Sequence, residues 1–321
     1  MRKLFLTGVI AITPHVINVQ EITNSQSEPK IEFEIEQPQR IKEDVFTQYR
    51  ENKDRWVQDY GEDLTNKLKN LRLELQERGH LEEDVKKILK NADVDDDVTR
   101  FFRRNVLRTA DSGEITFEEF SERIGLQWFV NNAQSFADKY EEVLKETEMK
   151  DNVDLRYIVG IIGIETKFGD NNNLGIHNLI NSLVTQYVTT RRQSFAVREL
   201  NYVLELTKKF GESFTEINGS YAGAIGIGQW IPSSIYYYST VESVGDLFCV
   251  EKMIPSVSNY LKEHGWDSEG NNKSLFENNR NWRAVRAYNH SDTYVKVVDE
   301  IAKGVKKSFK KSSHINGVML P

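Results

Sequence analysis

The chain has 321 residues, a formal net charge of −7, and a hydrophobic share of 39% that includes 16 Phe, 13 Tyr and 5 Trp. This composition excludes an intrinsically disordered chain, and the charge argues against a nucleic-acid binder, because phosphate contacts need a basic surface. The length allows one large domain or two ordinary ones, and the low Pro count of 6 favours a mainly α fold. Cys249 is the only cysteine, which excludes an internal disulfide and a cysteine metal cluster, and we expect it to be a small core residue.

The N-terminus has the order of a signal peptide. Arg2 and Lys3 precede the apolar run from Leu4 to Ile12. That run is shorter than the roughly 20 residues that a membrane span requires. We therefore expect residues 1–20 to be a signal peptide or short anchor that directs export to the periplasm or cell envelope. An ordinary buried N-terminal strand is the alternative.

Residues 21–40 are polar and are expected to form a linker, in which "KIEFEIEQ" reads as a short strand or an extended tether. Residues 41–150 are expected to be an N-terminal helical region that packs on the core. Apolar residues recur there at spacings of three and four, and Gly79 is a plausible helix stop. "LEEDVKKILKNA" predicts a shorter helix, and the stretch from Ile115 to Glu148 predicts one or two more.

Two acidic stretches in this region have spacings that calcium loops use. "ADSGEITFEEF" is similar to the second half of an EF-hand loop, but Arg108 and Ala110 fall on the first and third ligand positions and cannot ligate calcium. We therefore expect Ser112 or Thr116 to cap a helix there. "DVDDD" is expected to be a solvated turn.

The segment "GIIGIETKFGD" places one acid in an apolar run. Its spacing predicts a helix from Leu155 to Lys167 with Glu165 in the last turn, and Gly163 leaves room for a close approach to the backbone. A buried carboxylate costs several kcal/mol unless it is paired or protonated. Glu165 is therefore either an ion-pair partner of Lys167 or of an arginine, or a carboxyl group whose environment serves a reaction.

The segment "GSYAGAIGIGQWIPSS" combines glycines with small and apolar residues. Glycine at this spacing exposes backbone to a ligand or to a close neighbour. No strand is expected to lead into it, so nucleotide binding is only weakly indicated. Gln229 and Trp230 suit a sugar, because an amide binds hydroxyl or N-acetyl groups and an indole stacks on a pyranose ring. Ser233 or Ser234 is expected to cap the next helix.

A third segment, "WRAVRAYNHSDTYVKVVDEI", predicts a break between two helices. Tyr288 and Asn289 lie at the break, Ser291 or Asp292 caps the second helix, and Tyr294 is in its first turn. An Asn beside a Tyr in a cleft can hold the polar groups of a sugar. Taken alone, such a segment is more often a capped turn than a binding site.

Together the three segments resemble the lytic murein transglycosylases of the B type. Members carry "GxxGxET", a glycine-rich motif that ends in "GQ-aromatic-x-PSS", and a downstream "YN" pair. Here these read "GIIGIET", "SYAGAIGIGQWIPSS" and "AYN", in the same order. The resemblance extends from about Glu82 to Val305 and implies a lysozyme-like catalytic domain over residues 151–310, followed by a tail at 311–321.

The resemblance also implies an activity. Members cleave the β-1,4 bond between N-acetylmuramic acid and N-acetylglucosamine in peptidoglycan, and the muramyl 6-hydroxyl attacks the anomeric carbon to leave a 1,6-anhydro end. Glu165 would protonate the leaving oxygen and then deprotonate that hydroxyl. No second acid accompanies Glu165 in its motif, and an intramolecular nucleophile makes one unnecessary. Two alternatives stay open, a hydrolase on the same fold and a catalytically inactive glycan-binding protein.

Further site residues follow from the same resemblance. Ser220 and Asn289 would bind the carboxyl group of Glu165 or the substrate near it, and Gln229 would bind an N-acetyl or hydroxyl group. The aromatic residues expected to provide packing surface are Trp230, Tyr260, Tyr288 and Tyr294. Arg191 and Arg192 would face muramyl lactate or stem-peptide carboxylates, or would form a solvated helix start.

The sequence departs from the family at two places. The segment after "PSS" is short and has few acids, so we expect the calcium site of the family to be lost, with no metal or cofactor. His177 and Asn178 stand where members have an aliphatic residue and Asp, and His177 is expected to be a satisfied helix residue. The expected partner is the peptidoglycan glycan strand, bound by a monomer and with no nucleic acid. Association with the membrane or with cell-wall machinery is left open.

Overall fold

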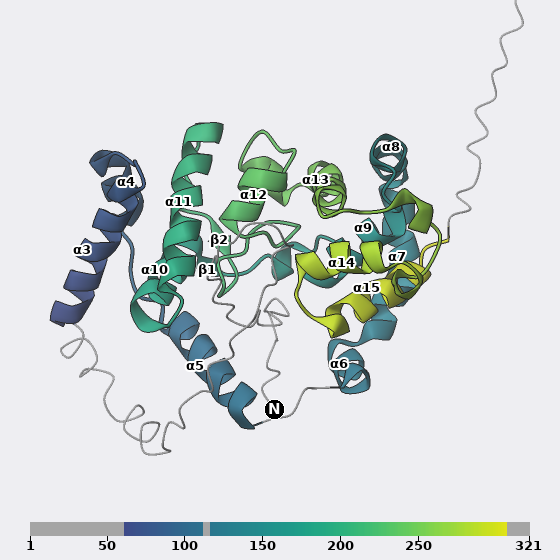
Figure 1. The fold of residues 1–321 in the computed structure, drawn as a ribbon, viewed down its shortest axis with the longest axis horizontal. Coiled ribbons are helices and arrows are strands. Elements are labelled where there is room, and N and C mark those ends of the chain that lie inside the picture. The colour runs from purple at the N-terminus through teal and green to yellow at the C-terminus, as the bar shows by residue number, and fades with distance from the viewer. Residues whose placement is uncertain (1–60, 112–115, 307–321) are drawn as a thin grey trace, which may run out of the picture.

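The structure, a computed structural model, describes residues 61–111 and 116–306. The predicted signal peptide, the linker, residues 41–60, Ser112 and the C-terminal tail lie outside the described residues. The described part is mainly helical and elongated, with its helices arranged in two groups (Figure 1). None of its helices is both long and apolar enough to cross a membrane.

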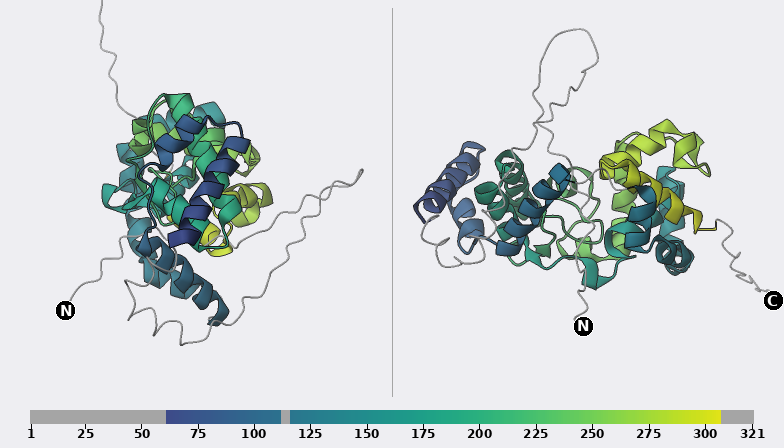
Figure 2. Two further views of the ribbon diagram at one scale, coloured as in Figure 1. Left: turned by 90° about the vertical axis from the view of Figure 1, so that its left-hand side faces the viewer. Right: turned by 90° about the horizontal axis from the view of Figure 1, so that it is seen from below.

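One group of helices contains the N-terminal part of the described chain. Helices α3, α4 and α5 pack against α10 and α11. They lie at one end of the molecule, which is seen end-on in Figure 2. The bounds are α3 Gly61–Glu77, α4 Glu82–Leu89, α5 Asp96–Asp111, α10 Leu179–Thr189 and α11 Gln193–Phe210.

The other group surrounds the apolar helix α9. Helices α7, α8, α13 and α15 all contact α9, and α6 and α14 contact α15. The predicted region 41–150 is thus divided between the two groups, with its first helices on α10 and α11 and its later ones around α9. The bounds are α6 Phe117–Ile124, α7 Leu126–Lys139, α8 Glu141–Asp151, α9 Leu155–Thr166, α12 Pro232–Tyr238, α13 Val250–Glu263, α14 Asn279–Tyr288 and α15 Asp292–Lys303.

Short elements join these helices. Strands β1 (His177–Asn178) and β2 (Asn218–Gly219) form an antiparallel pair in which His177 is opposite Gly219. β2 leads directly into the glycine-rich segment, so the expectation that no strand precedes this segment is wrong. The 3-10 turns are η1 Asn171–Asn173, η2 Gly245–Phe248, η3 Ser268–Gly270 and η4 Leu275–Glu277.

The segment from Ile115 to Glu148 contains three helices, where one or two were predicted. Thr116 caps α6 in a capping box with Glu119, as expected. Gly125 then takes a left-handed conformation, with a φ of 70°, and ends α6. Tyr140 has a non-helical conformation and separates α7 from α8. Single-residue breaks of this kind leave the helical spacing of apolar residues almost unchanged, so the pattern reads as continuous.

Two predictions about polar residues are also corrected. His177 lies in β1, not in a helix, and its Nδ1 is 2.7 Å from Oδ2 of Asp95. Asp95 is therefore not part of a solvated turn, because its other oxygen also accepts the backbone N–H groups of Asp97 and Val98 at the start of α5. Cys249 is half-buried just before α13 and is not a core residue.

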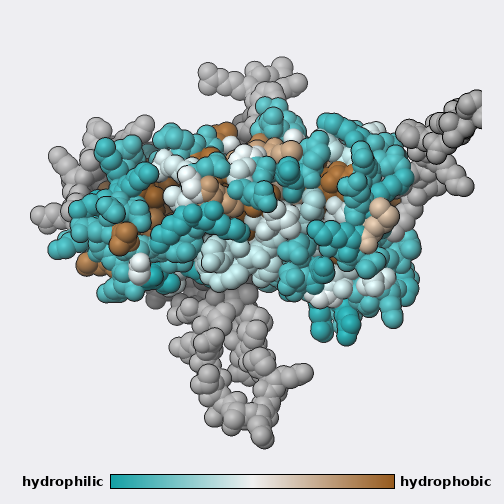
Figure 3. Space-filling view, turned by 90° about the horizontal axis from the view of Figure 1, so that it is seen from above, coloured by the Kyte–Doolittle hydropathy of each residue, from teal (hydrophilic) through white to brown (hydrophobic). Residues whose placement is uncertain are grey.

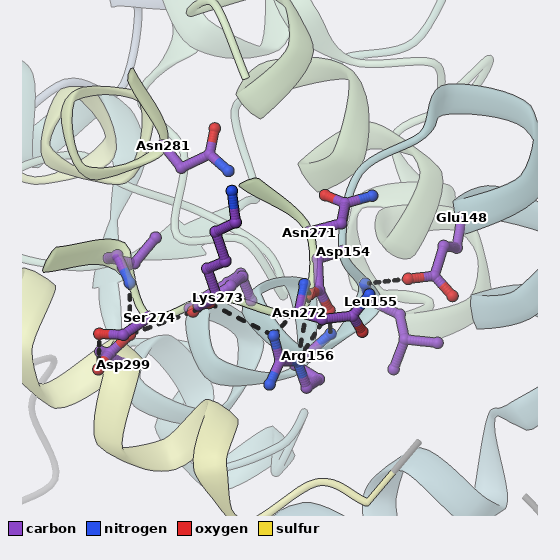
Figure 4. A network of polar contacts seen from close by, with 12 residues as sticks. Glu148, Asp154, Leu155, Arg156, Asn271, Asn272, Lys273, Ser274, Asn281 and Asp299 are labelled. Carbon is purple, nitrogen blue, oxygen red and sulfur yellow. Dashed lines mark hydrogen bonds and ion pairs between the residues drawn. The ribbon is translucent and has the colours of Figure 1, made fainter. Parts of the chain in front are cut away.

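A polar network fixes the start of α9 (Figure 4). Asp154 is fully buried, caps the backbone N–H of Arg156, and pairs with the Arg156 guanidinium at 2.7 Å. The same carboxylate accepts the backbone N–H of Asn272 at 2.8 Å. From α15, Asp299 accepts the Ser274 hydroxyl at 2.9 Å. The loop before α14 is thus tied to both α9 and α15.

Seen from above, most of the surface is hydrophilic, and pale and brown residues are scattered along it, including its middle (Figure 3). This face includes α12, which lies between α11 and α13 (Figure 1). The glycine-rich segment, which runs from β2 to α12, contacts both groups of helices, because Gln186 of α10 bonds to the carbonyl of Tyr221 and Thr166 of α9 bonds to that of Ile227.

Candidate active site

Glu165 lies in the last turn of α9, as predicted. Every residue of this helix except Arg156 and Glu165 is buried. Close packing on α15 is possible because Gly160 has no side chain, and a Cβ there would lie 2.8 Å from the carbonyl oxygen of Val298. The helix therefore delivers one carboxyl group from the apolar core to its surface.

The surroundings of Glu165 favour its neutral form. Burial raises the pKa of Glu165 to about 8, and a hydrogen bond from Tyr294 lowers it in part. The Tyr294 hydroxyl donates to Oε1 of Glu165 at 2.8 Å. No other ionisable side chain of the described residues contributes to this pKa shift. At neutral pH the group therefore holds a proton that it can donate.

The role of Tyr294 is more direct than the sequence indicated. It was expected to provide packing surface, and it is the hydrogen-bond partner of the acid. Ser291 caps α15 as predicted and places Tyr294 in the first turn. The signal in the sequence was this fixed position after the cap, but the direction of the hydroxyl depends on how α15 packs on α9.

Aromatic side chains extend from Tyr294 away from Glu165. The rings of Tyr294 and Tyr288 are parallel, with centroids 6.5 Å apart, and Tyr260 contacts Tyr288 at 4.8 Å. Burial, and next the nearby charge of Glu165, raises the pKa of both Tyr288 and Tyr294 well above the ordinary value. These hydroxyls are therefore neutral donors at all physiological pH values.

Trp230 does not have the role of an open stacking surface. Its indole is only 3% exposed, and its Nε1 donates to the Tyr288 hydroxyl, which in turn donates to the carbonyl of Gly228 at 2.6 Å. Gly228 is required here because a Cβ would lie 3.0 Å from that hydroxyl. Trp230 thus holds the tyrosines in place from behind.

The glycine-rich segment forms a tight loop. Ile225 and Trp230 exchange two backbone hydrogen bonds of 3.0 Å, and the Ile227 N–H bonds to the carbonyl of Leu247 at 2.8 Å. Gly226 has a φ of 72°, and a Cβ there would lie 2.4 Å from the Leu247 carbonyl oxygen. The loop is therefore held against η2 by backbone contacts that only glycine permits.

Gln229 is the residue of this loop best placed to bind a ligand. It is 8% exposed and has a φ of 48°, which is unusual for a residue with a side chain. Its Nε2 donates to the carbonyls of Gly226 at 3.0 Å and Leu174 at 3.3 Å. Its buried Oε1 accepts no hydrogen bond from the described residues. The amide oxygen is thus a buried acceptor whose position is fixed by the two hydrogen bonds that Nε2 donates.

Thr166 connects the acid to the loop, a role that the sequence reasoning missed. Its hydroxyl is 3.2 Å from the carbonyl of Ile227 and accepts the N–H of Gly169 at 3.1 Å. The "ET" pair in the motif was the available signal. Thr166 therefore fixes the end of α9 against the segment that bears Gln229.

An unusual turn follows. Lys167, Phe168 and Gly169 all have left-handed φ values, of 51°, 64° and 82°. The Phe168 ring lies against Gly163, where a Cβ would come within 2.7 Å of it. The room that Gly163 leaves is therefore filled by this ring. Left-handed residues with side chains are strained and need support from their surroundings.

The remaining predicted residues are not in contact with the Glu165 carboxyl group. The Ser220 hydroxyl accepts the N–H groups of Ala222 and Ala224 and so shapes the loop. Asn289 ends α14 and is half-buried. Its side chain makes no hydrogen bond with the described residues, so it can bind a ligand.

Arg191 is exposed, whereas Arg192 is held at the start of α11. Its guanidinium lies 4.0 Å from the ring centroid of Phe195 and 5.0 Å from that of Phe102. Burial lowers the pKa of Arg192 to about 10, so the group remains charged at neutral pH. Arg192 therefore lies at a helix start, but its guanidinium is not solvated as the alternative interpretation required.

The cap of α12 differs from the prediction. Neither Ser233 nor Ser234 caps it, because Pro232 begins the helix and Ile231 is the capping residue. The buried carboxylate of Glu199 in α11 instead accepts the Ser233 N–H at 2.8 Å and its hydroxyl at 3.1 Å. Among the described residues, no group of three or more His, Cys, Asp or Glu side chains could hold a metal ion.

Comparison with known proteins agrees with this arrangement. The family model "Transglycosylase SLT domain" matches residues 63–272. The membrane-bound lytic murein transglycosylase B of Escherichia coli (strain K12) is 34% identical over 142 residues, which cover 43% of this chain and 38% of that protein. The matched part thus spans well under half of this curated relative.

Solved structures share the fold. The Escherichia coli lytic transglycosylase Slt35, solved in complex with bulgecin A, has a TM-score of 0.60 at 22% identity, and the match covers 74% of this chain and 92% of that one. Pseudomonas aeruginosa SltB1 has a TM-score of 0.62 at 19% identity, with coverages of 76% and 96%. Pseudomonas aeruginosa SltB3, bound to NAG-NAM-pentapeptide, has a TM-score of 0.63 at 18% identity, with coverages of 74% and 78%.

The predicted mainly α, lysozyme-like transglycosylase fold is therefore confirmed. The family model covers well over half of the chain, and the matched residues include Glu165 and the glycine-rich loop. The chain belongs to the transglycosylase SLT domain family.

Proposed function

We propose that this protein is a lytic transglycosylase of peptidoglycan. It cleaves the β-1,4 bond between N-acetylmuramic acid and N-acetylglucosamine and forms a 1,6-anhydro end. Family membership and the similarity to murein transglycosylases support the reaction class. The observation that carries the proposal is Glu165, a carboxyl group whose pKa burial raises to about 8 and whose one hydrogen-bond partner among the described residues is Tyr294.

The reaction needs one group that acts first as an acid and then as a base. Glu165 donates its proton to the glycosidic oxygen, and the bond between this oxygen and the muramyl anomeric carbon breaks with its electron pair on the oxygen. The N-acetyl carbonyl oxygen of the muramyl residue stabilises the positive charge. The Glu165 carboxylate then removes the proton of the 6-hydroxyl, whose oxygen bonds to the anomeric carbon. Glu165 is protonated again at the end.

Tyr294 serves both halves of this cycle. Its hydroxyl donates to Oε1, which leaves Oε2 to carry the transferable proton. A hydrogen bond to a carboxylate is stronger than one to a neutral carboxyl group. Tyr294 therefore stabilises the anion that forms after the first proton transfer, and it holds the rotamer of Glu165 throughout.

The substrate is bound by groups around the acid. Gln229 Oε1 accepts a hydrogen bond from an N-acetyl N–H or a hydroxyl group. The Asn289 side chain, at the break between α14 and α15, binds other polar groups of the sugar. Ser220 acts through the shape of the loop. Arg191 and Arg192 attract lactyl or stem-peptide carboxylates. The complex of SltB3 with NAG-NAM-pentapeptide supports this class of ligand.

We further propose that the protein acts as an exported monomer in the cell envelope, where its polymer lies, without a metal or cofactor. The relative from Escherichia coli is named as membrane-bound. The calcium site expected to be lost stays a prediction. One structure of Slt35 is a complex with calcium.

Mass spectrometry of digested sacculi tests the reaction. The full chain is incubated with purified peptidoglycan, and we expect released muropeptides that are one water lighter than those with reducing ends. Reducing-end products would show that the protein is a hydrolase. Binding to sacculi without any release would show a glycan-binding protein.

A further inference from the structure

A second polar and aromatic surface lies on α11 and α12, outside the site described above. It contains an open hollow of about 480 Å³. Its lining residues are Glu205, Lys208, Lys209 and Tyr236. None of these four residues is hydrogen-bonded to Glu165 or to Tyr294.

Lys209 is the cation that this hollow offers to a ligand. Lys208 is 3.5 Å from the Glu205 carboxylate and 3.2 Å from Nδ1 of His80, so its charge is already engaged. The Lys209 ammonium makes no hydrogen bond or ion pair with the described residues. It lies instead 5.9 Å from the ring centroid of Tyr236 and 5.6 Å from that of Phe210. It can therefore pair with an anion without breaking an existing ion pair.

Tyr237 offers an aromatic face next to the hollow. It is 60% exposed, which is unusual for a large ring. Its ring lies 5.2 Å from Tyr236 and 5.3 Å from Tyr202, and its hydroxyl is hydrogen-bonded to that of Tyr202. The Tyr237 ring is thus held in one position by its neighbours, so little side-chain conformational entropy is lost when a ligand packs on it.

A series of ring contacts links this surface to the catalytic site through the interior of the protein, because Tyr260 and Tyr294 are buried. Tyr238 follows Tyr237 on α12 and contacts Tyr260 at 4.8 Å. Tyr260 in turn contacts Tyr288, the neighbour of Tyr294. One short helix therefore presents Tyr236 and Tyr237 towards α11 and Tyr238 towards the aromatic groups beside Glu165. Its place between α11 and α13 is visible in Figure 1.

We propose that Tyr237 and Lys209 form a second binding site for an acidic saccharide, distinct from the site around Glu165. The apolar face of a pyranose ring packs on Tyr237, and a carboxylate carried by the same sugar or by its peptide pairs with Lys209. In peptidoglycan both features occur on the muramyl residue. The site would hold a more distant part of the polymer whose bond is cut at Glu165. This choice of polymer rests on the proposed function.

A pelleting assay with purified sacculi tests the site. All variants carry Glu165→Gln so that no cleavage takes place. We expect Tyr237→Ala and Lys209→Ala each to weaken binding by about 5-fold to 20-fold, since each loses one local contact of roughly 1–2 kcal/mol. Lys209→Arg should retain most of the affinity. The matched controls are the exposed residues Phe276 and Lys87, each changed to Ala.

Binding within twofold of the parent for both Tyr237→Ala and Lys209→Ala would overturn the proposal. Because Tyr237 and Lys209 are exposed, the variants should keep the melting temperature of the parent, which shows that they fold. A second arm uses an N-acetylglucosamine oligosaccharide, which has no carboxylate. Lys209→Ala should leave its binding unchanged, and an equal loss for both ligands would contradict the ion pair.

A further experiment distinguishes failure of the proposed reaction from failure of the second binding site. With Glu165 present, the two substitutions should raise KM on sacculi and leave kcat on short soluble muropeptides unchanged. A protein that bound sacculi through Tyr237 and Lys209 but released no anhydro product would refute the reaction and retain the binding site.

Discussion

At the scale of residues, Glu165 combines an apolar helix with a single phenolic donor. Ten of the twelve residues of α9 are buried, and the carboxyl group leaves the helix beside Tyr294. Burial raises the pKa of Glu165 to about 8, and the Tyr294 hydrogen bond limits that rise. Burial and the Tyr294 hydrogen bond therefore determine the pH range in which Glu165 is protonated and the stability of its carboxylate form.

Glu165→Gln should make the free energy of unfolding depend less on pH. The folded pKa of Glu165 lies above its unfolded value of 4.5, so the folded state holds a proton that the unfolded state loses. The stabilising contribution is complete below the unfolded pKa and is lost as the pH rises through the folded pKa. Relative to the variant, the wild type should lose up to about 5 kcal/mol of unfolding free energy between about pH 4.5 and about pH 8. Urea unfolding across this window measures the difference. Parallel pH profiles would contradict the raised pKa.

Tyr294→Phe should lower kcat and move the pH profile. Loss of the hydroxyl leaves the Glu165 carboxylate without its donor, which costs about 10-fold to 100-fold in rate for a charged hydrogen bond. The pKa of Glu165 should rise, because this hydrogen bond lowers it. The alkaline limb of the kcat profile should therefore shift to higher pH.

Tyr187→Phe is the matched control for this prediction. Tyr187 is a buried residue whose hydroxyl donates to Glu74 at 2.7 Å, and the hydroxyl makes no hydrogen bond to Glu165. The substitution should alter stability without a shift of the alkaline limb. A Tyr294→Phe profile that only falls in height, with an unchanged limb, would mean that Tyr294 has no influence on the proton of Glu165.

At the scale of elements, the site depends on how closely α15 and the glycine-rich loop approach α9. Gly160 lets α15 come near enough for Tyr294 to reach Glu165, and Thr166 ties the end of α9 to the carbonyl of Ile227. Both contacts join residues far apart in the chain. The acid is positioned by neighbours on two sides, not by its own helix alone.

Gly160→Ala should reduce both stability and activity. A Cβ at this position would lie 2.8 Å from the Val298 carbonyl oxygen, so α15 must move. Overpacking of this kind costs about 1–3 kcal/mol, and the movement should lengthen the Tyr294 hydrogen bond. Thermal unfolding and kcat measure the two effects. Gly245→Ala is the control, because the nearest atom to a Cβ there is 3.8 Å away. Full activity of Gly160→Ala would show that the α9–α15 spacing does not control the acid.

The local features of these elements could be predicted from the sequence. The apolar run of α9 and the Ser291 cap of α15 depend on neighbouring residues, and the structure confirms both. The hydrogen bonds from Ser233 to Glu199 at the start of α12 could not be predicted, since they depend on the packing of α11 against α12. For the same reason, the burial of Trp230 and the direction of the Tyr294 hydroxyl required the fold. Motif spacing identified the residues near the site but not their partners.

At the scale of the whole molecule, the two groups of helices are connected near the strands β1 and β2. The Asp95 carboxylate caps α5 and pairs with His177, which is opposite Gly219 in the strand pair. Burial would raise the pKa of Asp95, but the hydrogen bond with His177 helps to lower it below the ordinary value. One carboxylate therefore joins an N-terminal helix to β1, the strand that pairs with β2, and β2 leads into the site loop.

Asp95→Ala should destabilise the protein more than an equivalent change nearby. It removes the cap of α5 and leaves the buried His177 without its partner, which costs about 2–4 kcal/mol. Asp97→Ala is the matched control, because Asp97 is exposed and its one ion pair within the described part of the chain is with the exposed Arg100. Differential scanning calorimetry should give the lower melting temperature for Asp95→Ala. Equal melting temperatures would contradict the connecting role of Asp95.

The central claim is that Glu165 alone supplies the proton and removes it again. Its most direct test compares anhydro ends released from purified sacculi by the wild type, by Glu165→Gln and by the exposed control Glu212→Gln. The wild type and the control should release them equally. Glu165→Gln should retain binding and fall by about 1,000-fold or more, since the amide can do neither proton transfer. Undiminished release of anhydro ends by Glu165→Gln would contradict the account.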